Sequence, residues 1–111
     1  MNHLKYQSCI IACHDCAIEC ARCGNECLSE ASIQMLARCL KLTRDCTDIC
    51  LLAVNAMASD SEFAKQICSL CEEICTACAN ECEKHSHLEH CLSCEAQCRL
   101  CSIECSKMSK M

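Results

Sequence analysis

The stretch CIIACHDCAIECARCGNEC, residues 9–27, decides the fold, because its six cysteines are spaced alternately four and three residues apart. Residues three and four apart are neighbours on one face of an α-helix, with Cβ atoms about 5–6 Å from each other. In a helical bundle such a face forms the inward seam, where leucine is the usual residue. The stretch therefore predicts a helix that turns a row of thiols toward a core.

The same spacing recurs twice more along the chain. Residues 68–82 and residues 91–105 each carry five cysteines that are alternately three and four residues apart. Residues 30–58 carry only three cysteines, and ordinary apolar residues are expected to fill the rest of that seam. The candidate metal ligands are all nineteen cysteines: Cys9, Cys13, Cys16, Cys20, Cys23, Cys27, Cys39, Cys46, Cys50, Cys68, Cys71, Cys75, Cys78, Cys82, Cys91, Cys94, Cys98, Cys101 and Cys105.

Four helices with short connections are expected to account for nearly the whole chain. Proline is absent and Gly24 is the only glycine, so little in the sequence interrupts a helix. Ser59-Asp60-Ser61-Glu62 and Ser86-His87-Leu88-Glu89 have the pattern of a capping box, in which serine and glutamate cap the start of a helix. The expected helices are Leu4–Leu28 with Asn2 as its cap, Glu30–Ala58, Ser59–Lys84 and Ser86–Met108.

Connections this short make consecutive helices antiparallel. The predicted fold class is therefore all-α, an antiparallel up-down-up-down four-helix bundle with a cysteine-lined core. Residues 1–111 are expected to form a single domain of this kind.

The net charge and the apolar runs argue against two classes of partner. The formal charge is −5 at pH 7 and no basic run occurs, so no nucleic-acid partner is expected. The longest apolar run, Ile49–Val54, is far too short to span a membrane. The first residues lack the pattern of a secretory signal, so a cytoplasmic location is expected, where a high cysteine content indicates metal binding before disulfides.

Thiolates bind soft metals, chiefly Cu(I), Zn(II) and iron–sulfur clusters. Zinc takes four ligands, and an isolated tetrathiolate zinc site keeps two negative charges, which are costly to bury because the seams offer no lysine or arginine. A Cu(I) ion held by bridging thiolates instead cancels the charge of one thiolate, which leaves a neutral core with about one Cu(I) per cysteine. Charge balance therefore favours multiple Cu(I) ions, and a metallothionein-like Zn(II) or general soft-metal buffer is the alternative.

Three other classes of function fit the sequence less well. The bacterial iron–sulfur run, Cys-x2-Cys-x2-Cys-x3-Cys-Pro, is absent, and no βαβ pattern surrounds the Cys-x-x-Cys pairs as in thiol–disulfide enzymes. A disulfide-stapled structural helical protein stays an alternative, although nineteen is an odd number of thiols. No catalytic triad or glycine-rich phosphate loop is evident, so the chain is not expected to be an enzyme.

The two ends of the predicted bundle carry different side chains. His85 follows Cys82 by three residues and His87 precedes Cys91 by four, so both histidines extend a cysteine row. His90 is less well aligned and is expected to be exposed. Metal is expected to enter at this end, where the candidate entry residues are Met35, His85, His87 and His90. The opposite end is expected to be closed by Val54, Met57 and Phe63.

The remaining side chains are expected to fill the second seam or to lie outside the bundle. The seam of residues 30–58 is expected to run through Met35, Cys39, Leu42, Cys46, Cys50 (or Ile49), Ala53 and Met57. A solvated outer face is expected for Glu19, Glu26, Glu72, Glu73, Glu81 and Glu95. Apolar patches off the seams are expected at Ile11, Ile18, Leu36 and Leu40.

The chain resembles the copper storage proteins of the bacterial cytosolic type, a family of cysteine-rich four-helix bundles. The resemblance rests on the three cysteine rows, on Cys46-Thr-Asp-Ile-Cys50-Leu-Leu-Ala-Val and on Cys82-Glu-Lys-His-Ser-His-Leu-Glu-His-Cys91, and it covers essentially all 111 residues. It implies Cu(I) storage inside the bundle, all nineteen cysteines as ligands, residence in the cytosol and a homotetramer. It also implies that the histidines after Cys82 lie at the mouth of the bundle. The expected partners are copper ions and a copper chaperone or a small-thiol copper carrier.

Overall fold

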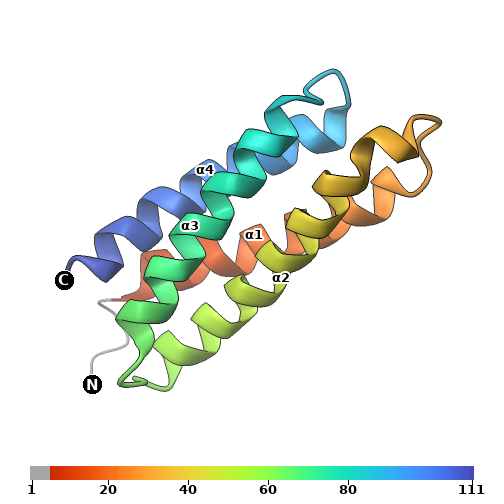
Figure 1. Cartoon of the computed structure of the whole chain (residues 1–111). Coiled ribbons are helices and arrows are strands. Elements are labelled where there is room, and N and C mark those ends of the chain that lie inside the picture. Colours follow the sequence, from red (N-terminus) through yellow and green to blue (C-terminus); the bar gives the residue numbers. More distant parts are fainter. Residues whose placement is uncertain (1–5) are drawn as a thin grey trace.

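The computed structural model describes residues 6–111, which form four antiparallel helices. The elements are α1 (Gln7–Cys27), the short 3-10 helix η2 (Ile33–Leu36), α2 (Ala37–Ala58), α3 (Ala64–Glu83) and α4 (Glu89–Ser109). No strand occurs in that part of the chain. The predicted all-α, up-down-up-down bundle is confirmed (Figure 1).

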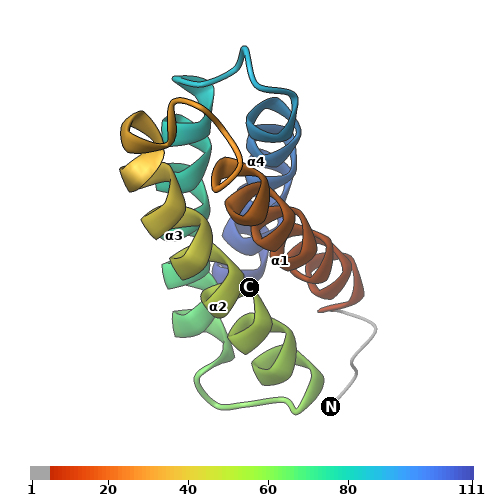
Figure 2. The ribbon, with the colours of Figure 1, turned by 90° about the vertical axis from the view of Figure 1, so that its right-hand side faces the viewer.

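The helices form a closed ring in which each one packs against two others. α1 packs against α2 and α4, and α3 packs against the same two helices, so α1 and α3 lie diagonally opposite (Figure 2). The molecule is elongated, with extents of 48 × 18 × 18 Å. We call the end that holds the connections 28–36 and 84–88 the histidine end, and the end that holds the connection 59–63 and the C-terminus the terminal end. None of the helices in residues 6–111 is long and apolar enough to cross a lipid bilayer.

The second seam differs from the prediction at two positions, Met35 and Leu42. Leu36 and Thr43 are buried, with 0% and 1% of their surface exposed, whereas Met35 is 73% exposed and Leu42 is only partly buried. The 3-10 helix, which has three residues per turn, places Leu36 instead of Met35 on the buried face. Thr43 lies in α2, four residues after Cys39 and three before Cys46, so it shares the buried face of these two cysteines. Met35 is therefore not a core residue, and Leu36 does not contribute to an outer apolar patch.

The first predicted capping box is wrong, because its residues end α2 instead of opening α3. Asp60 has a φ of 54°, in the left-handed region. The N–H of Ser61 donates to the carbonyl of Ala56 at 2.8 Å, and the N–H of Asp60 donates to the carbonyl of Met57 at 3.3 Å. These two bonds define a Schellman motif, which satisfies the last carbonyls of a helix. α3 consequently begins five residues later than expected, at Ala64.

The second predicted capping box is also wrong. The N-cap of α4 is Leu88, whose backbone is extended and whose side chain caps nothing, and the helix begins at Glu89. Residues 84–88 are used to turn the chain, since the N–H of His85 donates to Cys82 O and the N–H of Leu88 donates to His85 O. α2 likewise begins later than the expected Glu30, at Ala37. The expected Asn2 cap and Leu4 start of the first helix lie outside the described residues.

The terminal end is closed by apolar side chains, though not by all of those predicted. Met57 and Met108 expose 0% and 2% of their surface and Tyr6 exposes 6%, so these three cover the core at this end. Val54 is partly buried and packs against the core. Phe63 is 56% exposed and does not close the core, because the Schellman turn places it outside the bundle.

Candidate metal centre

All nineteen cysteines are buried, and none of them is in a disulfide. Eighteen expose 0% of their surface and Cys9 exposes 4%. Their spacing places them on the seam of each helix, and the four seams meet along the bundle axis. The sulfur atoms therefore form the core itself.

Four cysteines, one from each helix, form what we call the central layer: Cys16, Cys46, Cys75 and Cys98. The Sγ atom of Cys46 lies 3.8 Å from that of Cys16, 3.5 Å from that of Cys75 and 3.9 Å from that of Cys98. The Sγ atoms of Cys16 and Cys98 are 3.7 Å apart. A single layer thus joins sulfur atoms from all four helices.

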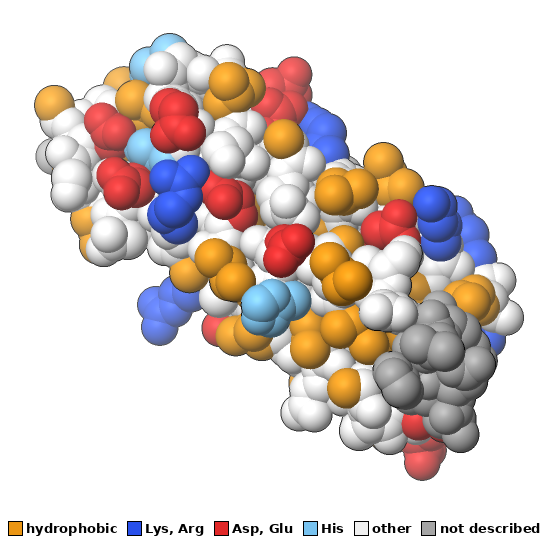
Figure 3. All heavy atoms as spheres, turned by 180° about the vertical axis from the view of Figure 1, so that it is seen from behind, with side chains coloured by type: hydrophobic (Ala, Val, Ile, Leu, Met, Phe, Trp, Pro, Cys, Tyr) orange, Lys and Arg blue, Asp and Glu red, His pale blue; other side chains and the backbone are white. Residues whose placement is uncertain are grey.

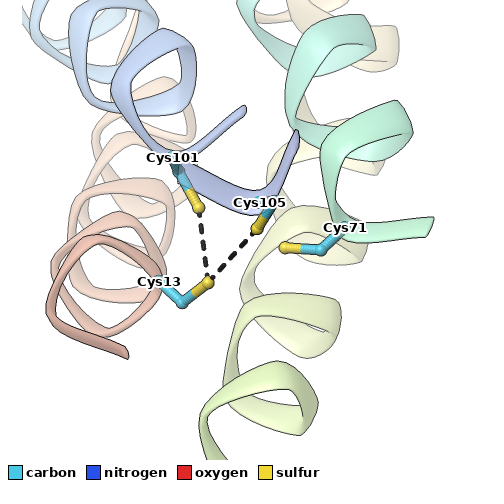
Figure 4. Close-up of side chains that lie close together, drawn as sticks. All are labelled: Cys13, Cys71, Cys101 and Cys105. Atoms are coloured by element: carbon cyan, nitrogen blue, oxygen red, sulfur yellow. Dashed lines mark hydrogen bonds between the residues drawn. The ribbon is translucent and has the colours of Figure 1, made fainter. Parts of the chain in front are cut away.

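A second set of sulfur atoms lies between the central layer and the terminal end. In Figure 4 the side chains of Cys13, Cys71, Cys101 and Cys105 point toward one another from three helices. Their Sγ atoms all lie within 4.8 Å of one another, and the Sγ of Cys13 is 3.5 Å from that of Cys105 and 3.6 Å from that of Cys101. This geometry provides three or four sulfur ligands around one point.

Neighbouring groups of sulfur atoms share members. Cys16 and Cys46 belong to two groups of four whose ligand atoms lie within 4.8 Å, one completed by Cys50 and Cys75 and the other by Cys20 and Cys98. The pair Cys20 and Cys98 then belongs to a further group, with Cys78 and Cys94. Because a thiolate can bridge two ions, shared members indicate a connected cluster along the axis and not a set of separate sites.

At the histidine end, a group of side chains that could hold a metal ion includes an imidazole. His90 forms a group with Cys23, Cys27 and Cys91, and its Nδ1 lies 3.4 Å from Cys23 Sγ and 3.6 Å from Cys91 Sγ. Its Nε2 lies 2.7 Å from Glu30 Oε2, a contact that orients the ring. The expectation that His90 is exposed is wrong, since 5% of its surface is accessible. The signal in the sequence was its position four residues before Cys94, which places it on the seam.

The other candidate entry residues are not members of the group that His90 forms with Cys23, Cys27 and Cys91. His87 is exposed, and Met35 is 73% exposed. His85 is half-buried, and its Nε2 lies 3.0 Å from Glu81 Oε2. All three are in the connections at the histidine end, on the outside of the core.

Glu81 was expected on the solvated outer face and is instead buried, with 5% of its surface exposed. It accepts hydrogen bonds from Arg38 at 3.0 Å, and it lies 3.4 Å from Lys84 Nζ and 3.0 Å from His85 Nε2. Burial raises the pKa of the carboxyl group, but the hydrogen bonds from His85, Arg38 and Lys84 outweigh it and lower the pKa overall. The cluster fixes the last turn of α3 beside the first turn of α2.

Burial and hydrogen bonding both change the acidity of the thiols. Burial raises the pKa of Cys27 to about 11 and that of Cys91 to about 12, from the ordinary value of 9.0. In the interior, the hydrogen bond with Cys101 and those with neighbouring thiols lower the pKa of Cys16, while the bond with Cys16 and burial raise that of Cys20. The core therefore holds shared protons that a metal ion must displace.

The stability of the apo protein is expected to fall at alkaline pH. Cys27 and Cys91 keep their protons in the folded state up to about 11 and 12, whereas the unfolded chain releases them near 9.0. The stabilisation is therefore complete below pH 9 and is lost as pH rises from there through these two values. Urea unfolding midpoints measured anaerobically from pH 7 to 11 test this, and replacement of both residues by serine is expected to flatten the decline.

The core formed by residues 6–111 contains no buried lysine or arginine to balance thiolate charge. Among the described residues, the buried polar or charged side chains are Thr43, Glu81 and His90, and none is a lysine or arginine. A set of bound ions must therefore supply its own neutrality. This confirms the charge pattern expected from the seams.

Comparisons with known proteins agree with this geometry. A family model, "Csp: Copper storage protein", matches residues 2–110. The cysteine-rich protein YhjQ of Bacillus subtilis (strain 168) is 48% identical over 85 residues, which are 77% of this chain and 78% of that protein. The Cu(I)-bound copper storage protein BsCsp3 is 46% identical and has a TM-score of 0.88, over 93% of this chain and 96% of that one. A cytosolic copper storage protein from Streptomyces lividans, with five coppers, is 29% identical and has a TM-score of 0.93, over 98% of this chain and 95% of that one. The chain belongs to the copper storage protein family.

Proposed function

We propose that this protein stores Cu(I) ions on the thiolates of its core, at about one ion per cysteine. The observation that carries the proposal is the continuity of the sulfur array. Contacts of 3.5–4.0 Å between Sγ atoms connect the sulfur atoms within and between neighbouring layers, and four-ligand groups share members along the axis. Membership of the copper storage family and the Cu(I)-bound state of BsCsp3 support the choice of ion.

Zinc is the second candidate, and one observation favours it. With a Zn–S bond of about 2.3 Å, the sulfur atoms of a tetrahedral site lie about 3.8 Å apart, which falls within the spacing found here. Charge argues against it. Each Zn(II) adds two positive charges and needs about four sulfur ligands, so even shared thiolates leave several negative charges in a core that has no buried lysine or arginine in residues 6–111. Cu(I) at one ion per thiolate leaves none.

An anaerobic titration with Cu(I) tests the storage function. The reduced protein, with its free thiols counted beforehand, is expected to bind about 19 Cu(I) per chain in competition with a strong chelator. Bound Zn(II) is expected to be displaced completely by Cu(I). Saturation at about 5 ions per chain, or Zn(II) that Cu(I) fails to displace, would show a zinc-type buffer instead.

Copper is proposed to enter at the histidine end. His90 is the one residue there that combines an imidazole nitrogen with direct sulfur neighbours, so it can pass an ion to Cys23 or Cys91 by ligand exchange. Met35, His85 and His87 stand outside it as softer or borderline donors that meet an ion first. The terminal end offers no comparable route, because Met57, Met108 and Tyr6 cover the sulfur atoms.

The protein is further proposed to act as a single storage domain without enzymatic activity, in the cytoplasm, with a copper chaperone or a small-thiol carrier as its partner. The description of the Streptomyces lividans relative as cytosolic supports the location. A homotetramer is proposed on the family resemblance. Exposed apolar side chains support self-association: Ile11 and Ile18 on α1 are 52% and 56% exposed, and patches of hydrophobic side chains lie on the face shown in Figure 3.

A further inference from the structure

A groove of about 430 Å³ lies between α1 and α2, on the side of the bundle and in the half nearer the histidine end. Its wall includes Cys20, Gly24 and Thr43, and its rim carries Lys41, Arg44 and Asp48. Small-molecule sites commonly have volumes of about 300–1,000 Å³. The groove is therefore large enough for a compact ligand, and one core cysteine belongs to its wall.

The groove exists because two helices meet here with little side chain between them. Gly24, the only glycine of the chain, has no side chain to fill the space. A Cβ atom on it would lie 3.2 Å from Thr43 Oγ1, closer than side chains normally approach. Thr43 is itself held back toward its own helix, since its Oγ1 donates to Leu40 O at 3.1 Å. The cover over the sulfur core is consequently thin at this point.

The rim of the groove carries charge that the protein does not use. Lys41 and Arg44 form no ion pair with any residue in 6–111, although six other ion pairs of lysine or arginine with glutamate occur in that range. Asp48 adds one carboxylate. A ligand with two acidic groups and one ammonium group would match all three side chains.

Cys20 holds a central place in the sulfur array. Its Sγ lies 3.5 Å from Cys98 Sγ, 3.7 Å from Cys94 Sγ and 3.9 Å from Cys16 Sγ. It belongs to two four-ligand groups, one on each side of it along the axis. An ion released from Cys20 can therefore be replaced from either group.

We propose that this groove binds a small thiol of net negative charge, which exchanges Cu(I) with Cys20. The inference rests on the proposed storage of Cu(I). In the exchange, the sulfur of the ligand forms a bond to the Cu(I) ion as the bond from Cys20 to that ion breaks, and the proton of the ligand thiol passes to Cys20. No oxidant or reductant is needed. Cys20 exposes 0% of its surface, so the ligand reaches it when the thin cover at Gly24 and Thr43 opens.

A charge variant tests the recognition step. The protein loaded with Cu(I) is mixed anaerobically with mercaptoethanesulfonate, which is anionic, or with cysteamine, which is cationic, and the loss of bound Cu(I) is followed over time. Replacing Lys41 and Arg44 by glutamine is expected to slow removal by the anionic thiol about tenfold and to leave removal by the cationic thiol unchanged or faster. Comparing each variant with the parent protein for the same probe cancels the different acidities of the two thiols.

Two further variants separate the groove from the overall charge. Replacement of Lys65 and Lys110, which are exposed and outside the groove, by glutamine changes the net charge equally and is expected to leave both rates unchanged. Ala21→Phe, which fills the groove, is expected to slow the removal of Cu(I) by both thiols several-fold. Ala96→Phe, on the exposed surface of α4, is expected to leave both removal rates unchanged.

If all variants lose Cu(I) to the thiols at the same rate while the copper capacity is intact, the proposal that the groove binds the thiol is wrong, and the storage function is unaffected. Failure of the parent protein to bind about one Cu(I) per cysteine would instead overturn the storage function. If the Lys41/Arg44 variant and the Lys65/Lys110 variant slow Cu(I) removal by the anionic thiol equally, the net charge of the protein attracts the thiol from a distance, and the proposed site is also wrong.

Discussion

Loading the apo protein with Cu(I) is expected to raise its unfolding temperature by more than about 20 °C. An ion that binds only the folded state adds about 4 kcal/mol when its free concentration is a thousand times its dissociation constant. For a domain of this size, each 1 kcal/mol shifts the unfolding temperature by about 4–8 °C. A few tightly bound ions are therefore sufficient, and the core offers many more.

The apo core is poorly built for stability, which makes the expected shift large. Its buried apolar side chains are mostly cysteine and alanine, and Leu36 and Met57 are the only larger ones that are fully buried in residues 6–111. Cysteine is smaller than leucine, so burying it gains less free energy and fills less of the space between helices. Bound ions supply both the missing contacts and bonds between helices.

Circular dichroism at increasing temperature, with and without stoichiometric Cu(I), measures this effect. The control is protein whose thiols have been alkylated, which is expected to show no stabilisation by Cu(I). An unfolding temperature that stays constant while copper is demonstrably bound would mean that the ions lie outside the core, contrary to the burial of the sulfur atoms.

The sequence predicted the core well because one residue type marks it. A row of thiols at alternating spacings of three and four fits only one face of a helix, so the fold class and the burial of the cysteines followed directly. The helix ends did not follow. Ser59 fits a cap by its local sequence, but its N–H and its hydroxyl both donate to Asn55 O, so it ends α2. The Schellman motif that follows it depends on how α2 and α3 pack.

Side chains near the histidine end were the least predictable. The position of His90, four residues before Cys94, indicated that it lies on the seam, but its pairing with Glu30, 60 positions away in the sequence, could not be read from that spacing. Glu81 is buried because Arg38 reaches it from another helix at 3.0 Å. Contacts between residues so distant along the chain depend on the final packing, and the spacing of residues within one helix does not report on them.

Blocking the central layer is expected to cut the copper capacity to less than half. Replacing Cys16, Cys46, Cys75 and Cys98 by valine puts an apolar plug across all four helices. Valine is apolar and only slightly larger than cysteine, so the fold is expected to tolerate the change at about 1 kcal/mol per site. Beyond the plug, toward the terminal end, lie seven cysteines: Cys9, Cys13, Cys50, Cys68, Cys71, Cys101 and Cys105. Ions that enter at the histidine end cannot reach them.

The histidine side of the plug keeps eight cysteines: Cys20, Cys23, Cys27, Cys39, Cys78, Cys82, Cys91 and Cys94. The plugged protein is therefore expected to bind about 8 Cu(I) instead of about 19, at one ion per accessible thiolate. A matched control replaces four cysteines at the terminal end, Cys9, Cys68, Cys71 and Cys105, by valine. Because no plug lies across the route inward, this control is expected to lose only its own four sites and to bind about 15 Cu(I).

Circular dichroism first shows whether both variants are helical. Anaerobic titration then counts the bound copper, and the count decides whether copper enters at the histidine end alone or at the terminal end as well. A capacity of about 8 for the plugged protein means that ions reach the far sulfur atoms only through the core. A capacity of about 15 for both variants would mean that copper also enters through the terminal end, past Met57 and Met108, and would contradict the proposal that this end is closed to copper. The groove at Cys20 opens on the histidine side of the plug, so exchange there does not change either expectation.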